Sequence, residues 1–334
     1  MTPTVRSAKA DDTTQISALL LKAAQRRNLT NAEIWPLANN CAEDVRNVVH
    51  GGIEGASQSP EEFWHVAEVS GEIVGVSRAM ILPIPPIYAG LLGLPGLILD
   101  DFAVADGADP RTGEALLQAT EVALTKAGAG FFLVSKVACD APRPEIDKLG
   151  YAPLTLYFAK ADLETTEVGA VRPATTEDVS AIVAASAKHR KTVAEISRFW
   201  IPHVDADSRF ANWMEISLTL KDRDMMVVEQ SAGLHGYVIA QPIAGFLVPA
   251  GHEKEKLGVI DDFYDGDFSE IEGRLSETSN AVALLSAAES ALDTRGFQAA
   301  FVVCPAGWPS KRSVLVTQGY GIAKTWFIKA EGKL

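Results

Sequence analysis

The chain has 334 residues, a net charge of −13, 47% hydrophobic residues and 22% charged residues. This length exceeds one ordinary hydrophobic core and fits two domains of typical size. The negative charge argues against nucleic acid as the main partner, because binding a polyphosphate backbone needs clustered lysines and arginines. Cys41, Cys139 and Cys304 lie far apart and form no CxxC pair, which predicts reduced thiols in a cytoplasmic protein.

An uncharged stretch at Ala79–Leu99 has about the length of a membrane span. Four prolines and three glycines interrupt it, and that many helix breakers exclude a single spanning helix. The stretch therefore predicts a strand end, an apolar loop and the next strand, and we expect no membrane partner. The loop Ile81–Pro95 has three possible roles: to cover an acceptor site, to pack on another domain, or to form a dimer contact.

The sequence repeats itself once. Val5-Arg6-Ser7-Ala8 precedes Asp12, and Val171-Arg172-Pro173-Ala174 precedes Asp178 at the same spacing. Each pattern predicts a short strand and then a helix start. Five further pairs follow in the same order, at residues 71–75 and 232–236, 99–102 and 260–263, 113–126 and 280–294, 131–137 and 299–304, and 150–160 and 319–329.

Each copy is predicted to run strand, helix, helical segment, three strands, helix, strand, short helix and strand. The polar segment Asp162–Gly169 joins the copies. We therefore expect two domains, residues 1–163 and residues 169–334, called here the first half and the second half. Whether their sheets exchange strands is left open.

This order resembles the GNAT acetyltransferase superfamily over nearly the whole chain, twice. Ser7–Asp12 and Pro173–Asp178 look like the usual opening of that family, and Lys148-Leu149-Gly150-Tyr151 looks like its usual sequence before the last strands. The resemblance implies an α/β (α+β) fold of two tandem GNAT-like domains. Each would have a mixed, mostly antiparallel central sheet flanked by helices.

The resemblance also implies a chemistry. In such a fold the central strands splay apart, and the pantetheine arm of acyl-CoA pairs with exposed backbone of the fourth strand. The next loop wraps the pyrophosphate at a helix N-terminus, where unpaired N–H groups and the helix dipole favour an anion. An amine attacks the thioester, and donors from the fourth strand stabilise the oxyanion. The implied function is N-acyl transfer from acetyl-CoA, or a related acyl-CoA, to a small amine, without a metal.

In the first half the fourth strand is predicted at Leu97–Val104, with a helix from about Gly113. The family's loop pattern Q/R-x-x-G-x-G/A is half present, because Gly113 fills its last glycine while Arg111 and Ala108 replace the other two residues. Arg111 is either a phosphate ligand or an exposed loop charge. The resemblance assigns acyl-CoA binding to Phe102, Ala103, Val104, Arg111, Thr112, Gly113 and Glu114.

In the second half the corresponding loop, Tyr264–Asn280, is seven residues longer, and no glycine precedes Ala283 in the place that the family's pattern requires. It has one base, Arg274, against five acids, and such a loop repels a pyrophosphate. We therefore expect acyl-CoA in the first half only, with the second half shaping the substrate site or supporting the pseudo-dimer. The five acids are Asp265, Asp267, Glu270, Glu272 and Glu277.

The family's usual general acid is a tyrosine on the short helix, but the matching positions hold Ile146 and Leu315. Asp100 and Asp101 on the fourth strand are the predicted catalytic residues, with Asp140 and Glu145 as further acid–base candidates. The Asp pair recurs at residues 261–262, which favours a role in the fold.

The histidines and the tryptophans do not indicate a clear site. The six histidines show no metal-ligand spacing such as HxxxH. Trp35, Trp64, Trp200 and Trp213 follow the first helix of each half, where they either line an acceptor pocket or belong to the core.

The leading hypothesis is a cytoplasmic N-acyltransferase with a small-molecule amine as acceptor, acting as a monomer or a homodimer. The alternative is a non-catalytic tandem GNAT protein that binds a small molecule or a protein, which the two missing tyrosines favour. Transfer of an aminoacyl group from tRNA is a third possibility, and the acidic charge disfavours it.

Overall fold

The computed structural model describes residues 2–55, 61–165, 169–231, 233–273 and 279–330. The element order predicted for both copies is confirmed. The first half contains β1 (Thr4–Ser7), α1 (Thr13–Thr30), α2 (Cys41–Glu54), β2 (Glu62–Val69), β3 (Glu72–Ile81), β4 (Leu94–Val104), α3 (Thr112–Lys126), β5 (Ala129–Val137), α4 (Pro144–Lys148) and β6 (Ala152–Ala161). The second half contains β7 (Val171–Pro173), α5 (Val179–Ile196), α6 (Ala206–Ser217), β8 (Asp224–Gln230), β9 (Gly233–Pro242), β10 (Leu257–Asp265), α7 (Asn280–Thr294), β11 (Ala299–Pro305), α8 (Pro309–Thr317) and β12 (Gly321–Lys329).

The repeated opening motif has a local physical cause. Arg6 on β1 binds Asp12 with an N–O distance of 2.6 Å, and the Lys9 backbone N–H donates to the same carboxylate at 2.8 Å. In the second half Arg172 binds Asp178 at 2.8 Å. The hydrogen bond from Arg6 lowers the pKa of Asp12, so the carboxylate stays charged at the entry to the first long helix. The arginine and the aspartate of the motif thus join each first strand to its first helix.

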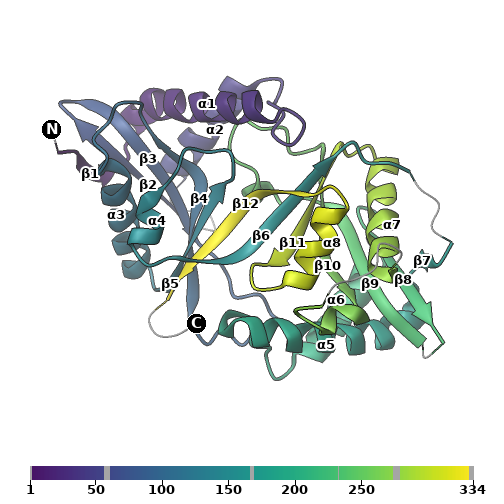
Figure 1. The fold of residues 1–334 in the computed structure, drawn as a ribbon. Helices are drawn as coiled ribbons and strands as arrows, with labels where there is room; N and C mark the ends of the chain where they lie inside the picture. The colour runs from purple at the N-terminus through teal and green to yellow at the C-terminus, as the bar shows by residue number, and fades with distance from the viewer. Residues whose placement is uncertain (1, 56–60, 166–168, 232, 274–278, 331–334) are drawn as a thin grey trace.

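The strands of the described residues form one twelve-stranded sheet in the order β1-β2-β3-β4-β5-β12-β6-β11-β10-β9-β8-β7 (Figure 1). β12, the last strand of the second half, pairs antiparallel with β5 of the first. β6, the last strand of the first half, pairs antiparallel with β11 of the second. The two sheets therefore join by strand exchange, with β12 and β6 paired at the centre.

A lysine at the end of each exchanged strand pairs with a glutamate of the opposite half. Lys329 on β12 lies 2.7 Å from Glu121 on α3, which also accepts a hydrogen bond from Tyr151 at 2.7 Å. The closing Gly-Tyr of the repeat thus supplies the phenol that helps to hold this glutamate. The equivalent contacts in the second half are made by Lys160, Tyr320 and Glu289.

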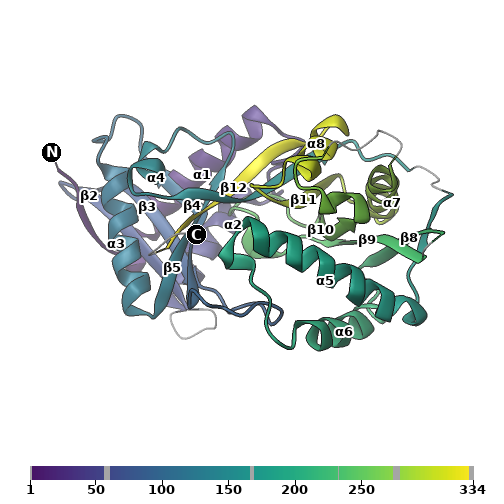
Figure 2. The same cartoon turned by 60° about the horizontal axis from the view of Figure 1, so that its bottom comes forward.

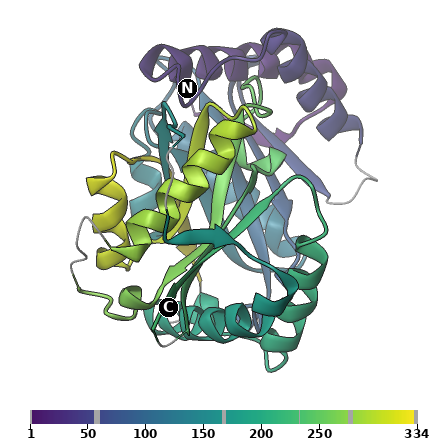
Figure 3. The same ribbon diagram turned by 90° about the vertical axis from the view of Figure 1, so that its right-hand side faces the viewer.

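Helices cover both faces of the sheet in each half. In the first half α1 and α2 pack on one face and α3 and α4 on the other, and in the second half α5 and α6 lie opposite α7 and α8 (Figure 2). The α1–α2 pair and the α5–α6 pair lie at opposite ends of the end-on view in Figure 3. Neighbouring residues of one strand contribute to the cores on opposite faces of the sheet. Val66 on β2 packs on the α1–α2 side and its neighbour Ala67 on the α3 side.

The apolar loop between β3 and β4 packs on the second half, which is one of the three roles predicted for it. Ala89 N–H donates to the Ile201 carbonyl at 2.8 Å, and the Tyr88 ring lies 5.3 Å from the Trp200 ring. No helix among the described residues is long and apolar enough to span a membrane. Trp35 and Trp64 are buried in the core, as one of their two interpretations predicts.

Candidate functional site

In the first half, the central strands β4 and β5 separate from each other at the bulge in β4. β4 pairs in parallel with β5 from Leu94 to Ile98, and their pairing ends there within the described chain. On its other side β4 stays paired with β3 through Val104, after a shift of register beyond Ile98. The backbone edge of Phe102–Val104 that faces β5 is therefore free of strand pairing.

A cavity of about 430 Å³ opens at this splay. Its walls come from α1, the end of β4, the following loop, the start of α3 and the segment 139–145. Four residues that the sequence assigned to acyl-CoA line it: Phe102, Ala103, Val104 and Gly113. Gly113 lies against the end of a neighbouring side chain, because a Cβ atom there would lie 3.0 Å from Glu145 Oε1.

The other three predicted cofactor residues lie outside the cavity lining. Thr112 is fully buried at the start of α3. Glu114 pairs with Lys148. Arg111 is 66% exposed and pairs with Asp109, the carboxylate of which accepts from the guanidinium at 2.8 Å and 3.0 Å. That hydrogen bonding holds the pKa of Asp109 below its usual range.

Two cations stand at the cavity wall on α1. Lys22 Nζ lies 2.8 Å from Asp106, and Arg26 pairs with the same carboxylate. All three side chains are about half exposed and line the cavity. The cavity lining as a whole has four basic and four acidic residues, so the excess of positive charge that suits an anionic ligand is confined to this wall.

Arg143 is a cavity residue that the sequence analysis did not single out. Its side chain is 10% exposed, and its guanidinium stacks over the Phe102 ring at 3.6 Å. Nε donates to Glu145 at 2.9 Å, whereas Nη2 is buried and has no hydrogen-bond partner among the described residues. Burial lowers the pKa of Arg143. A buried donor without an acceptor is costly, so this N–H is placed to bind an oxygen or a sulfur of a ligand.

Asp100 and Asp101 are buried and paired with residues from other strands and from the second half. Asp100 lies 2.8 Å from the Lys324 ammonium on β12. Asp101 lies 2.8 Å from the Arg78 guanidinium and accepts the Ala250 N–H at 2.9 Å. These contacts fasten the second half to the bulge of β4. The catalytic role of the two carboxylates stays a prediction.

Comparison with protein-family models and with curated proteins finds no match for this chain. Comparison with solved structures finds a tandem GNAT protein from the clavulanic acid biosynthesis pathway at 11% identity and TM-score 0.50, covering 99% of both chains. It also finds a GCN5-related N-acetyltransferase from Sphaerobacter thermophilus at 15% identity and TM-score 0.54, covering 98% of this chain and 95% of that one. The chain has a tandem GNAT fold. This likeness concerns the arrangement of the chain and identifies no substrate.

In this tandem GNAT fold the short helices carry aliphatic residues at the two tyrosine positions. Ile146 on α4 and Leu315 on α8 are both buried in hydrophobic clusters. Neither offers a proton, so a general acid at these positions is excluded.

The second GNAT-like unit closes its own splay with side chains. The parallel pairing of β10 with β11 ends at Ile260. Beyond it, the buried Lys311 ammonium donates to the Phe263 carbonyl at 2.7 Å and lies 5.4 Å from the Trp308 ring and 5.9 Å from the Phe268 ring. Phe263 is the counterpart of Phe102, so the backbone group that is free in the first half is occupied in the second. Arg274 and Glu277 of the acidic loop lie outside the described residues.

Proposed function

We propose that the chain is an acyltransferase that takes an acyl group from acetyl-CoA, or a related acyl-CoA, in the first half and transfers it to a small amine. The observation that carries this proposal is the asymmetry of the two splays. In the first, the backbone edge at Phe102–Val104 is free beside a cavity of about 430 Å³, whereas in the second the Phe263 carbonyl accepts a hydrogen bond from Lys311.

The cavity suits the two ends of acyl-CoA. A pantetheine arm carries amide groups, which can add to the free edge of β4 as an extra strand would. The N-terminus of α3 lies beside the cavity with Gly113 in its lining, although the N–H groups of Arg111 and Thr112 already donate to Asp109. Lys22 and Arg26 add positive charge at the wall. The anionic pyrophosphate is therefore proposed to lie between α3 and α1.

Arg143 is proposed to take the electrostatic role that a tyrosine would have on α4. The amine nitrogen attacks the thioester carbon, the C–S bond breaks, the amide forms, and CoA leaves as a thiolate while the ammonium proton passes to solvent or a base. The free Nη2 donor of Arg143 can stabilise the negative charge that develops on oxygen or sulfur. A guanidinium stays charged near neutral pH, so this stabilisation requires no proton transfer.

A titration followed by turnover tests the proposal. Isothermal titration of the purified protein with acetyl-CoA and with CoA should show binding at one site per chain. Release of free thiol in the presence of a panel of small amines would then identify the acceptor. No heat and no competition by CoA at millimolar concentration would contradict the acyltransferase.

A binding module is the second candidate function. Both tyrosine positions hold buried aliphatic residues, and both Asp100 and Asp101 are engaged in ion pairs. This candidate predicts that CoA binds and that no amine in the panel releases thiol. The same two measurements therefore separate the candidates.

A further inference from the structure

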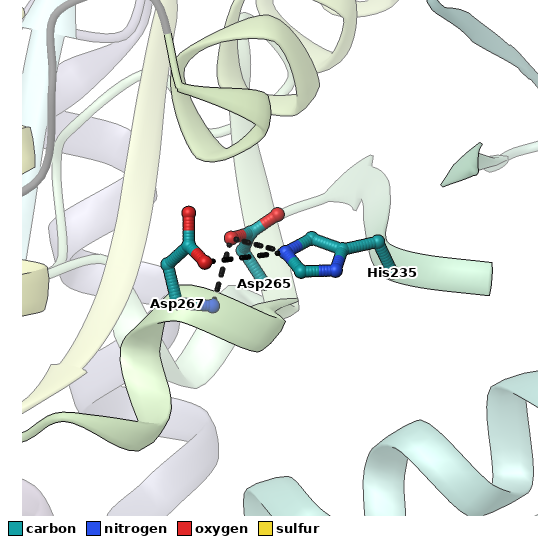
Figure 4. A group of neighbouring side chains, drawn as sticks. All are labelled: His235, Asp265 and Asp267. Atoms are coloured by element: carbon teal, nitrogen blue, oxygen red, sulfur yellow. Dashed lines mark hydrogen bonds and ion pairs between the residues drawn. The ribbon is translucent and has the colours of Figure 1, made fainter. Parts of the chain in front are cut away.

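Three side chains of the kinds that bind metal ions lie close together in the second half. His235 lies on β9, Asp265 ends β10, and Asp267 lies on the 3-10 turn η5 (Gly266–Ser269) that follows. Figure 4 shows the imidazole and both carboxylates pointing toward one another. His235 Nε2 lies 3.4 Å from Asp265 Oδ1 and 3.4 Å from Asp267 Oδ1.

The innermost member of this cluster accepts one backbone hydrogen bond, from the Asp267 N–H to Asp265 Oδ1 at 3.1 Å. Asp265 is fully buried, and its Oδ2 has no hydrogen-bond partner in the part of the chain that the structure describes. His235 is its one ion-pair partner in that part, and His235 Nε2 is itself buried without a hydrogen bond. A buried carboxylate with so few partners is costly in free energy. A cation bound between Asp265 Oδ1, His235 Nε2 and Asp267 Oδ1 would neutralise its charge.

The spacing fits a tetrahedral metal ion. Zinc binds histidine nitrogen and carboxylate oxygen at about 2.0–2.2 Å, and tetrahedral bonds of that length place neighbouring ligand atoms about 3.4 Å apart. We propose that His235, Asp265 and Asp267 form a binding site for a divalent transition-metal ion such as zinc. The imidazole ligand disfavours calcium and magnesium, which take oxygen ligands.

The proposed ligands are partly accessible from solvent, because the His235 side chain is 21% exposed. His235 lines a groove of about 710 Å³ together with Lys188, Thr192 and Tyr264. Asp267 is 47% exposed at the edge of the site. An ion held by three protein ligands here keeps one position for water or for a small ligand in the groove, as open zinc sites do.

The first half shows that the fold does not require these residues. Asp265 pairs across the sheet with the glycine that follows His235, and Val104 pairs with the glycine that follows Val74. Two of the three ligands therefore occupy the places of two valines in the first half. The second half, in which Lys311 donates to the Phe263 carbonyl, has polar side chains where the first half has valines, so the proposed site is a separate property of the second half.

Zinc titration of protein stripped with a chelator tests the site. We expect one equivalent of zinc to bind the wild-type chain and to raise its melting temperature. H235A and D267N should bind zinc at least about tenfold more weakly, because each removes one of the ligands. The matched control is H203A, because His203 is also close to a carboxylate, with Nδ1 3.6 Å from Asp205.

Cobalt gives a readout that an adventitious surface site would not produce. Co²⁺ held by these ligands in a four-coordinate site should show strong visible absorption in the wild type and in H203A, and D267N should lose it. Failure of the wild type to bind zinc below millimolar concentration would overturn the proposal. Unchanged zinc stoichiometry and affinity in folded H235A and D267N would overturn it as well, because the ion would then lie elsewhere.

Discussion

Lys329 Nζ lies 2.7 Å from Glu121 Oε2, although 208 residues separate the two in the sequence. The pair joins the last strand of the second half to α3 of the first, and Lys160 and Glu289 repeat it in the opposite sense. Glu121 is 12% exposed and Lys329 is 31% exposed, so the pair is better shielded from water than a surface ion pair. The closing strands are thus fixed in each other's domain by charge as well as by backbone pairing.

Substitution of this lysine should destabilise the whole molecule. K329M leaves Glu121 and its bond from Tyr151 without a cation, and we expect the free energy of unfolding to fall by about 1–3 kcal/mol. K148M is the matched control, because Lys148 is 64% exposed and its pair with Glu114 should contribute less than about 1 kcal/mol. Urea denaturation of both variants measures the difference, and equal midpoints would contradict the expectation.

A tryptophan in the first splay should block acyl-CoA. Val104 lines the cavity and is 36% exposed, so V104W can fill the space without entering the core. We expect acetyl-CoA binding to weaken by at least about tenfold, as calorimetry would show. V122W places the same side chain on an exposed face of α3 outside the cavity lining and should bind normally.

Loss of Arg143 should slow acyl transfer. R143M removes the unpartnered donor, and we expect kcat to fall by about 10²-fold with a smaller change in the KM for acetyl-CoA. R111A is the comparison, because Arg111 is exposed and committed to Asp109. Its KM should change by less than about threefold, and a rise of tenfold would instead identify Arg111 as a phosphate ligand. Steady-state kinetics on both variants decides these points.

Substitution of Asp101 distinguishes a structural role of this residue from a catalytic one. D101N keeps the shape of the side chain but removes the charge beside Arg78, which retains Glu62 as a partner. We expect the free energy of unfolding to fall by about 2 kcal/mol. The kcat of the folded fraction should change little. A large loss of kcat at unchanged stability would make this carboxylate a catalytic base.

Acid should weaken the contact between the halves through His252. Burial lowers the pKa of His252 to about 4, and its ring packs against Trp35 with centroids 5.6 Å apart. The unfolded chain has a histidine pKa near 6.5, so it binds the proton first as the pH falls. The stability from neutral His252 is therefore present above pH 6.5 and is lost between pH 6.5 and pH 4, by about 3 kcal/mol in all.

Paired denaturation curves check this sign. The stability difference between wild type and H252Q at pH 7 should shrink, or reverse, at pH 4.5, because glutamine does not titrate. H50Q, at an exposed position, serves as the control for the general effect of acid. A difference between wild type and H252Q that is the same at both pH values would contradict the prediction.

Much of the fold could be predicted from local patterns. The Arg6–Asp12 motif and its repeat mark helix starts through contacts six residues apart, and the breakers at Pro83–Gly96 exclude a membrane helix. The exchange of β6 and β12 could not be predicted, because either closing strand can pair with either fifth strand when their apolar patterns are alike. The partner of each closing strand is determined only when the folded sheet forms.

The candidate site, like the fold, could be predicted only in part from the sequence. The edge residues Phe102–Val104 were predicted from the resemblance to the GNAT family and do line the cavity. Arg143 was missed because its signal is a stacked guanidinium without an acceptor, which no spacing reveals. His235 and Asp265 lie thirty residues apart on neighbouring strands, so their meeting depends on the register of β9 with β10.

Strand exchange also determines when the sheet can be completed during synthesis of the chain. Synthesis has passed β5 and β6 long before β12 emerges, yet β12 must lie between them. The first half therefore cannot complete its sheet on the ribosome until about 160 further residues have been added. During that interval two strand edges stand open to water and to other chains, a state in which a nascent chain is prone to mispairing and depends on chaperones.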